Sequence, residues 1–337
     1  MVTVIYNLSK PEQGGVGRYA YEFLKRLRNK IDFSEIDLSP SFGKTTFQKM
    51  LSIMWKRKGY LLNKSAGYDD INHFLQTEIF YPIKGRNIVT LHNPPPFTKA
   101  IDGIAPDFYS LVRSVLFLNR YKDAVNNAEF IVADSDLVKE GVVEMGFEKN
   151  KVKVIGLGVD EKFKIIKGYD SRKNLIGFVG SFGKHKRVRE LLGDWRKSFD
   201  NLNKYRLEVY TGGVQNESLI KKYDKNFNIT FRGQINKENS IHAYNSFKAF
   251  MMSSRGEGFG LPIIEAVACG CPVFIYTDSK ISPEIRKYCI EIDSVSEIPE
   301  KLENVKYGNL TKKSKDVKKI FNWDRNVDDT LKLYKKL

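Results

Sequence analysis

The residues best suited to chemistry lie in one stretch, Ser253 to Val273, which reads SSRGEGFGLPIIEAVACGCPV. Two carboxylates, Glu257 and Glu265, stand there among glycines and apolar residues, and buried acids are rare unless they have partners. Glycines let a backbone approach a ligand closely, and the start of a helix favours anions. The stretch therefore favours a binding site for sugar hydroxyls and phosphate. The alternative interpretation is an ordinary capping glutamate beside a run of loop glycines.

The second half of the same stretch predicts a buried helix followed by a strand. Pro262 suits the first helical position, because its missing N–H costs nothing there, and this places Glu265 in the first helical turn. The residues that follow are apolar nearly all round, so the helix should be interior. The pattern predicts that it ends at Gly270 and Pro272 and that residues 273–276 form a short buried strand.

Glycine-rich turns also follow two other predicted strands, residues 2–6 and 175–179. Such a turn between a strand and a helix is the usual phosphate site of an α/β sheet. The first turn, GGVGRY, is an incomplete G-x-G-x-x-G without a matching acid downstream, which argues against an NAD site. The second, GSFGKHKRV, carries lysines that suit a diphosphate; without an anion, cations at a helix start would oppose the helix dipole.

One histidine and two aspartates are further candidates. The predicted strand 86–91 runs into His92 and three prolines, which cannot continue a ladder. His92 is therefore expected at the carboxyl end of a parallel strand, where α/β sheets bind ligands. Asp134 and Asp136 permit a metal site of the Asp-x-Asp kind, but the simpler interpretation is that Ser135 or Asp136 caps the next helix.

The spacing of Glu257 and Glu265, within EGFGLPIIEA and followed by GCPV, resembles the signature of family 4 of the GT-B glycosyltransferases. The resemblance covers most of the chain and is dense at residues 14–19, 178–187 and 253–276. It implies an α/β fold of two doubly wound Rossmann-like domains facing a central cleft. It also implies a retaining hexosyltransferase that moves a sugar from a nucleotide-diphosphate sugar to an acceptor hydroxyl.

The resemblance implies roles for individual residues. Glu257 and His92 would contact the donor sugar, and Lys186 would bind the diphosphate. Ser181 stands where the family often has an arginine, so that role would pass to Lys184 or Arg187, or be lost. The expected donor-binding residues are Gly15, Lys184, Arg187, Gly258, Phe259, Gly260, Leu261 and, at the ribose, Glu265. The expected acceptor-side residues are Gly14 and Arg18, although Arg18 also fits a solvated charge at a helix end. The family generally needs no metal, so we expect no metal and no other cofactor.

The chain has 337 residues, enough for two domains of about 150 each. Alternating strands and helices, twice over, argue for two doubly wound α/β domains. We expect an acceptor-side domain over residues 1–160 and a nucleotide-sugar-binding domain over residues 161–321. By the resemblance, a closing helix at residues 322–337 returns to the first domain. The turn at 156–160 departs from the family, which usually has Pro and Asn where this chain has Gly156 and Leu157.

The net charge of +16 indicates either an anionic binding partner or a charge that simply keeps the protein soluble. Residues 45–66 contain five basic residues and no acid, with an apolar face bordered by Trp55. That composition fits a helix lying on an anionic membrane surface, and the alternative is a helix packed on its own sheet. No spanning segment or signal peptide is expected. Three cysteines suggest no disulfide framework, so we expect a cytoplasmic protein, peripheral on the inner face of the membrane if the segment docks.

Other functions compete with the transferase. A retaining glycosidase would need its two carboxyls about 5 Å apart across a sugar bond, and it would leave the phosphate-binding turns without a purpose. A nucleotide-sugar epimerase on the same fold is a closer enzymatic alternative. A basic nucleic-acid-binding protein is the non-enzymatic alternative, but no known nucleic-acid motif is present, so no nucleic-acid partner is expected. The sequence does not name the sugar, the base or the acceptor, which is expected to be a glycan, a glycolipid or a lipid-linked sugar.

Overall fold

The computed structural model describes residues 1–6, 14–38, 67, 70–94, 118, 121–212, 223 and 227–337. The chain divides into two compact units. Unit 1 is Met1–Gly158 together with Trp323–Leu337, and unit 2 is Val159–Asn322. The first division falls inside the turn at 156–160. The basic segment 45–66 lies outside the described residues. Of the helix predicted at 107–128, the described residues 121–127 are helical.

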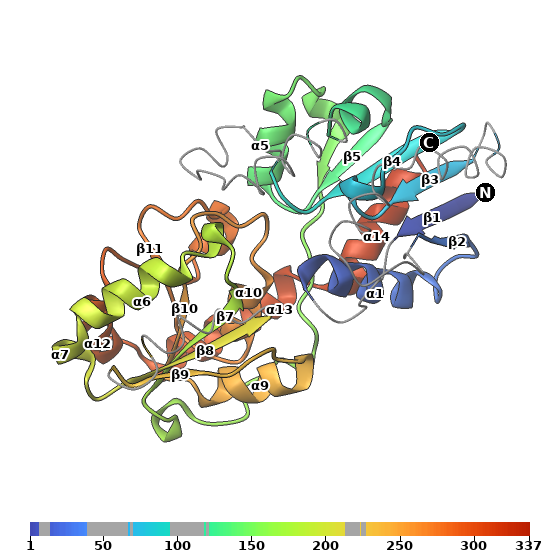
Figure 1. Cartoon of the computed structure of the whole chain (residues 1–337). Coiled ribbons are helices and arrows are strands. Elements are labelled where there is room, and N and C mark those ends of the chain that lie inside the picture. The colour runs from blue at the N-terminus through green and yellow to red at the C-terminus, as the bar shows by residue number, and fades with distance from the viewer. Residues whose placement is uncertain are drawn as a thin grey trace. The chain divides into compact units, whose positions relative to one another are not determined.

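Unit 1 is built on a parallel six-stranded sheet with the order β2-β1-β3-β4-β5-β6 (Figure 1). The strands are β1 (Val2–Tyr6), β2 (Ser34–Asp37), β3 (Ile71–Phe74), β4 (Arg86–Leu91), β5 (Phe130–Ala133) and β6 (Val152–Val154). The helices are α1 (Gly15–Leu27), α5 (Asp136–Glu144) and α14 (Trp323–Tyr334), and the 3-10 turns are η1 (Thr77–Ile79) and η3 (Lys149–Lys151). Because a parallel sheet is buried on both faces, helices cover both sides: α5 and the helical residues 121–127 on one, and α1 and α14 on the other.

The closing helix α14 packs against α1, although the two come from opposite ends of the chain (Figure 1). The buried face of α1 carries Tyr19, Phe23 and Leu27 at helical spacing, as the sequence predicts. At the start of α14, Gly158 lies so close that an added Cβ would stand 2.4 Å from the backbone nitrogen of Trp323. At its far end, Leu333 and Tyr334 bury against the sheet beside Ile88.

A chain of buried polar groups runs between the sheet and these two helices. His73 Nδ1 lies 2.6 Å from the Tyr334 hydroxyl, and its Nε2 lies 2.8 Å from Thr90 Oγ1. Thr90 Oγ1 in turn lies 3.3 Å from the Tyr19 hydroxyl. Burial lowers the pKa of His73 to about 3, with the nearby His92 adding to the effect. The imidazole is therefore neutral at pH 7, and each of its nitrogens has a hydroxyl partner.

We expect unit 1 to lose stability on mild acidification because of His73. Below its ordinary pKa of 6.5 the unfolded chain takes up a proton on His73, whereas the folded protein takes it up only near pH 3. Stability should therefore fall by about 1.4 kcal/mol per pH unit across that window. In urea unfolding at pH 7 and pH 5, His73→Gln should show a smaller drop than the wild type. An equal drop in both proteins would contradict this role.

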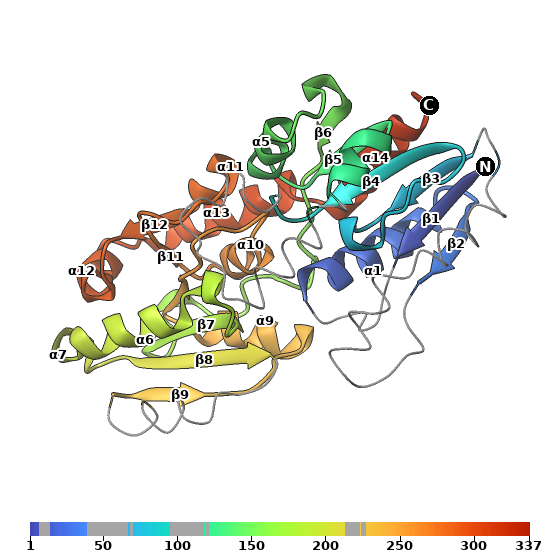
Figure 2. The same cartoon turned by 45° about the horizontal axis from the view of Figure 1, so that its top comes forward.

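Unit 2 repeats the architecture with the strand order β12-β11-β10-β7-β8-β9 (Figure 2). The strands are β7 (Leu175–Ser181), β8 (Arg206–Gly212), β9 (Ile229–Phe231), β10 (Ala249–Met252), β11 (Val273–Tyr276) and β12 (Cys289–Ile292). The helices are α6 (Val188–Lys197), α7 (Phe199–Leu202), α9 (Lys237–Ser246), α10 (Leu261–Ala268), α11 (Pro283–Arg286), α12 (Ile298–Glu303) and α13 (Tyr307–Ile320). The 3-10 turns are η4 (Tyr169–Ser171), η5 (Lys184–Lys186) and η6 (Val295–Glu297). The order reverses between β7 and β10, which is the arrangement of a dinucleotide-binding sheet.

The two faces of the second sheet are covered by different helices. Helices α6, α7 and α12 lie on one face and α9, α10 and α13 on the other (Figure 2). The segment after α9 packs tightly on Gly177 of β7, where an added Cβ would stand 2.0 Å from the ring of Phe247. Only glycine fits between this strand and the ring, so the residue sets how closely the segment after α9 approaches the sheet.

Two local predictions are wrong in detail. Leu261, not Pro262, is the first residue of α10, with Gly260 as its N-cap. Pro262 at the second position is tolerated for the same reason, because the first amides of a helix have no intrahelical partner. The shift places Glu265 in the second helical turn instead of the first.

In unit 1, Ser135 is the N-cap of α5 and accepts a 3.3 Å hydrogen bond from the Val138 amide, which confirms the capping interpretation.

Candidate functional site

The candidate site lies where the strand order of unit 2 reverses. Ligands of open α/β sheets bind outside the carboxyl ends of the strands at such a point. The loop after β7 leads through η5 into α6, and the loop after β10 contains the EGFG sequence and leads into α10. These two loops carry the lysine and the glutamate that the sequence analysis selected, 71 residues apart in the chain.

Hydrogen bonds to backbone carbonyls join these loops to each other and to the loop after β11. The Ser253 hydroxyl donates to the carbonyl of Lys186 at 2.6 Å, and the Arg255 amide donates to the His185 carbonyl at 2.8 Å. On the other side, the Lys280 amide donates to the Arg255 carbonyl, and the Glu257 amide donates to the Lys280 carbonyl at 3.1 Å. The three strand ends thus form one connected frame.

Within this frame Lys186 and Glu257 form an ion pair, with Nζ 2.5 Å from Oε1. The two side chains are 19% and 12% exposed, so both charges are largely shielded from water yet still reachable. The ammonium can bind phosphate oxygens as a point charge. The carboxylate can accept hydrogen bonds from hydroxyls. The structure brings together the two residues expected to hold a diphosphate and a sugar.

The start of α10 adds backbone donors beside this pair. Gly260 has φ +88°, a left-handed conformation that favours glycine, and an added Cβ would stand 3.1 Å from Ile263 and 3.7 Å from the Cβ of Glu257. Gly258 and Phe259 precede it, and the Phe259 ring is buried 5.3 Å from the ring of Phe321. Phe259 can therefore offer a ligand only its backbone, as the sequence analysis expected for this segment.

Glu265 projects from α10 and is 4% exposed. Its carboxylate is among the most deeply buried acids of unit 2, which fits a residue with a specific partner better than a solvated helix charge. Its expected contact with a ribose stays a prediction.

Arg187 occupies a different place from Lys186, its neighbour in the chain. Its guanidinium forms a two-pronged ion pair with Asp278, 2.7 Å for one of the two contacts, and stacks 5.4 Å from the centre of the Tyr276 ring. It lines a groove of about 380 Å³ beside α6. The groove is bounded by Arg187, Glu190, Asp194, Arg255, Tyr276, Thr277, Asp278 and Asp293. A diphosphate would have to compete with Asp278 for Arg187, whereas Lys184 is exposed to solvent.

The other candidates lie in unit 1. Gly14 is the N-cap of α1 with φ +86°, and among the described residues no atom lies within 4 Å of a Cβ added there. Gly15 begins the helix, and the amide of the half-buried Arg18 donates to the Gly14 carbonyl at 3.1 Å. The structure therefore places Gly14, Gly15 and Arg18 in one helical turn.

His92 follows β4 as predicted, but its two ring nitrogens face protein groups. Nε2 donates to the Leu75 carbonyl at 3.0 Å, and Nδ1 lies 3.5 Å from Oδ2 of Asp134. The ring of Tyr19 packs edge-on at 4.6 Å. The side chain is only 8% exposed. Contact between His92 and a donor sugar stays a prediction. The sugar would have to reach the part of the imidazole ring that Leu75, Asp134 and Tyr19 do not cover.

The sequence predicts for Asp134 only a place in an Asp-x-Asp metal pair or beside a helix start. It does not predict the position beside His92 that the structure shows. The Asp134 side chain is 2% exposed and lies beside His92, while the next residue, Ser135, caps α5. The available signal was position: β4 and β5 are neighbours in the sheet, so residues that follow their ends can meet.

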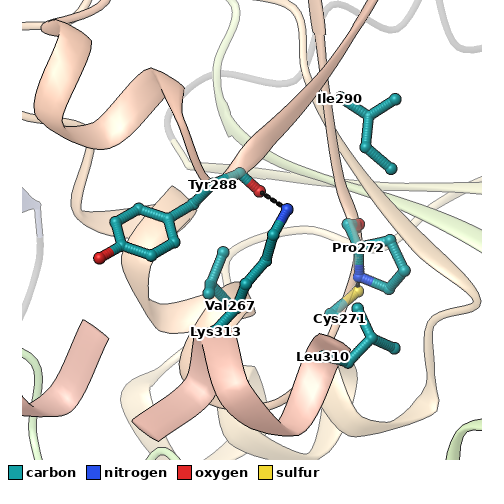
Figure 3. A pocket seen from close by; sticks show the side chains of 7 residues that line it. All are labelled: Val267, Cys271, Pro272, Tyr288, Ile290, Leu310 and Lys313. Atoms are coloured by element: carbon teal, nitrogen blue, oxygen red, sulfur yellow. Dashed lines mark hydrogen bonds between the residues drawn. The ribbon is translucent and has the colours of Figure 1, made fainter. Parts of the chain in front are cut away.

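A small enclosed cavity elsewhere in unit 2 is not a ligand site (Figure 3). Its volume of about 20 Å³ is room for a single water. Lys313 crosses it to donate to the Tyr288 carbonyl at 3.1 Å. Cys271 also lines it, and burial raises the pKa of that thiol to about 12. Such a protonated, buried thiol packs as an apolar group.

Among the described residues, no three His, Cys, Asp or Glu side chains gather in a way that could hold a metal ion. Over the same ranges, no helix combines the length and the apolar character needed to cross a bilayer.

Residues 159–309, which lie within unit 2, match the family model described as glycosyl transferases group 1. Among curated proteins, the chain is 22% identical over 293 residues to the O-antigen chain mannosyltransferase RfbU of Salmonella typhimurium, covering 81% of each chain.

Two solved structures share the fold over nearly the whole chain. Sucrose-phosphate synthase of Thermosynechococcus elongatus has a TM-score of 0.74 at 15% identity, covering 99% of this chain and 98% of that one. Anabaena HepE, solved in complex with UDP-glucose, has a TM-score of 0.66 at 13% identity, covering 99% and 100%. With the two parallel six-stranded sheets, this likeness confirms the expected fold class, two doubly wound α/β units of the GT-B type.

Proposed function

We propose that this protein is a retaining glycosyltransferase of family 4, which moves a hexose-type sugar from a nucleotide-diphosphate sugar to an acceptor hydroxyl. The observation that carries the proposal is the Lys186–Glu257 ion pair at the strand-order reversal of unit 2. It lies inside the segment that matches the group 1 glycosyl transferases. The complex of HepE with UDP-glucose supports a nucleotide-sugar donor.

Catalysis on this site would rest on positioning and electrostatics. Lys186 and the first amides of α10 would stabilise the negative charge that grows on the departing diphosphate. Glu257 would hold the sugar by accepting its hydroxyls. The acceptor hydroxyl would attack on the same face of the sugar that the diphosphate leaves, and a phosphate oxygen would take its proton. The sugar–phosphate bond breaks as the new glycosidic bond forms, which gives retention without a covalent enzyme intermediate.

The acceptor is proposed to be a glycan or a lipid-linked sugar, bound on the side of unit 1 that carries Gly14 and Arg18. The name of the relative RfbU, an O-antigen chain mannosyltransferase, supports a glycan acceptor. The proposed setting is the cytoplasmic face of a membrane.

A thermal-shift panel of UDP-, GDP-, ADP- and dTDP-sugars tests the donor. A ligand that binds only the folded state stabilises it by about 2.7 kcal/mol at a hundred times its Kd, so one group should raise Tm clearly. Transfer with that donor should continue in EDTA, because no metal is proposed. If none of the nucleotide sugars raises Tm, the proposed function is refuted. Conversion of the sugar without an acceptor would indicate an epimerase instead, and salt-sensitive nucleic-acid binding would indicate the non-enzymatic alternative.

We further propose that residues 45–66, which lie outside the described residues, dock on an anionic membrane. The support is their composition, five basic residues and no acid beside apolar side chains. Each Lys or Arg near such a surface contributes about 1 kcal/mol, enough in sum for reversible binding.

Vesicle sedimentation should show binding to acidic liposomes and none to neutral ones, because the attraction is electrostatic. Added salt should weaken it. Changing Lys56, Arg57 and Lys58 together to Glu should also weaken it, while changing Lys312, Lys315 and Lys319 of α13 together to Glu should leave it largely intact. If the protein stays in the supernatant with acidic vesicles at low salt, the docking proposal fails and the transferase proposal stands.

A further inference from the structure

The Lys186–Glu257 ion pair joins two groups that the proposed donor site needs for different parts of one ligand. A bound diphosphate needs the ammonium of Lys186, and a bound sugar needs the carboxylate of Glu257. In this structure, the two groups are paired with each other. Both side chains are more than four-fifths buried, and opposite charges attract more strongly there than at an open surface.

The backbone keeps the two groups together. The Lys186 carbonyl accepts from Ser253, and the Glu257 amide donates to Lys280. The loops are therefore connected at the base of both side chains. An ammonium that swings toward a phosphate still leaves the carboxylate beside the site, so binding of an anion at Lys186 always takes place next to Glu257.

The Lys186–Glu257 pair weakens the binding of a free nucleoside diphosphate. If it draws Lys186 away, Glu257 is left as a mostly buried carboxylate without its cation, which is costly. The carboxylate would also stand close to the negative phosphates, and like charges in one site oppose each other. A nucleotide sugar escapes both costs, because the hydroxyls of its sugar donate to Glu257 in place of Lys186.

We propose that Glu257 makes the site select the intact nucleotide sugar over the free nucleoside diphosphate, by holding Lys186 until sugar hydroxyls replace it. This rests on the proposed function and adds a specificity role to it. The same pair favours release of the product, because the departing sugar frees Glu257 to recapture Lys186 from the diphosphate.

Isothermal titration calorimetry with UDP, UDP-glucose, GDP and GDP-mannose tests this selection on the wild type and on Glu257→Gln. In the wild type, a sugar nucleotide should bind more tightly than its own diphosphate. In Glu257→Gln, the diphosphate should bind at least about fivefold more tightly than it binds the wild type, because no carboxylate competes for Lys186. The advantage of the sugar nucleotide should shrink by the same factor or more.

Two further variants separate this mechanism from a general effect of charge. Glu190→Gln removes one negative charge from a half-exposed side chain of α6, 3.6 Å from Arg255, and should leave the ratio of the two affinities unchanged. In a Lys186→Gln background, the Glu257→Gln change should improve diphosphate binding much less than in the wild type, because only the direct repulsion between the carboxylate and the phosphates is left to remove. A gain as large as in the wild type overturns the inference, because it cannot act through Lys186.

The outcomes distinguish this inference from the function on which it rests. If none of the four nucleotides binds the wild type and no ADP- or dTDP-sugar of the thermal-shift panel stabilises it, the nucleotide-sugar function and the selection are both overturned. If a nucleotide pair binds, but Glu257→Gln weakens the diphosphate or leaves its affinity unchanged while the protein keeps its wild-type Tm, the selection is overturned and the donor site stands.

Discussion

Lys186→Ala and Glu257→Gln are each expected to lower the rate of sugar transfer by about a hundredfold or more, while the protein stays folded. That is the usual scale for losing one preorganised electrostatic contact in a site that excludes water. Lys186→Ala removes the cation proposed to stabilise the departing diphosphate. Glu257→Gln keeps the shape of the side chain but weakens its hold on the sugar hydroxyls. Steady-state transfer rates with the donor found in the nucleotide-sugar panel provide the measurement.

Matched controls show whether the loss is specific. Arg189→Ala removes a positive charge from the exposed side of α6, three residues beyond Lys186, and should keep transfer within about twofold, as surface changes away from a site usually do. Glu190→Gln provides the same control for the carboxylate. The double variant of Lys186 and Glu257 should lose less than the product of the single losses, because the two residues act on one ligand. Near-normal turnover in both single variants would remove the donor site from this place.

Gly177→Ala is expected to have the largest effect on stability, destabilising unit 2 by about 3 kcal/mol or more. The added Cβ would stand 2.0 Å from the ring of Phe247, closer than any non-bonded contact. Gly177 lies in β7, paired on both sides by β8 and β10, so the strand cannot move away without breaking the sheet. Overpacking of a tight core commonly costs about 1–3 kcal/mol and sometimes more. Urea unfolding, or loss of soluble protein, would report it.

Gly193→Ala is the matched control, since it makes the same substitution in the same unit. Gly193 lies inside α6 with no atom within 4 Å of an added Cβ. Alanine in a helix interior should stabilise by about 0.5–1 kcal/mol. In a second test, Phe247→Leu should recover part of the stability that Gly177→Ala loses, because it shortens the ring that clashes. A Gly177→Ala protein as stable as the wild type would show that the strand and the ring can separate at little cost.

Local patterns in the sequence were enough to predict most elements of both sheets. The apolar runs at 2–6, 86–91 and 273–276 are strands β1, β4 and β11 with the expected bounds. These runs are buried on both faces, and such a run bounded by turn residues is a local property of the chain. The predicted boundaries of an element are less exact where two residues could each begin a helix. Leu261 and Pro262 both suit the first turn of α10, and the sequence alone does not decide between them.

The sequence by itself also indicated Glu257 among its glycines and the lysines beside the second glycine turn, and the family resemblance selected Lys186 among them. Only the tertiary structure decided that this lysine and this glutamate bind each other, that Arg187 turns to Asp278 instead, and that Asp134 faces His92. These pairs join loops as far as 91 residues apart. Periodicity reports whether a residue is buried, but not which strand end lies beside it. That depends on the order of the strands, which the packing of the whole sheet determines.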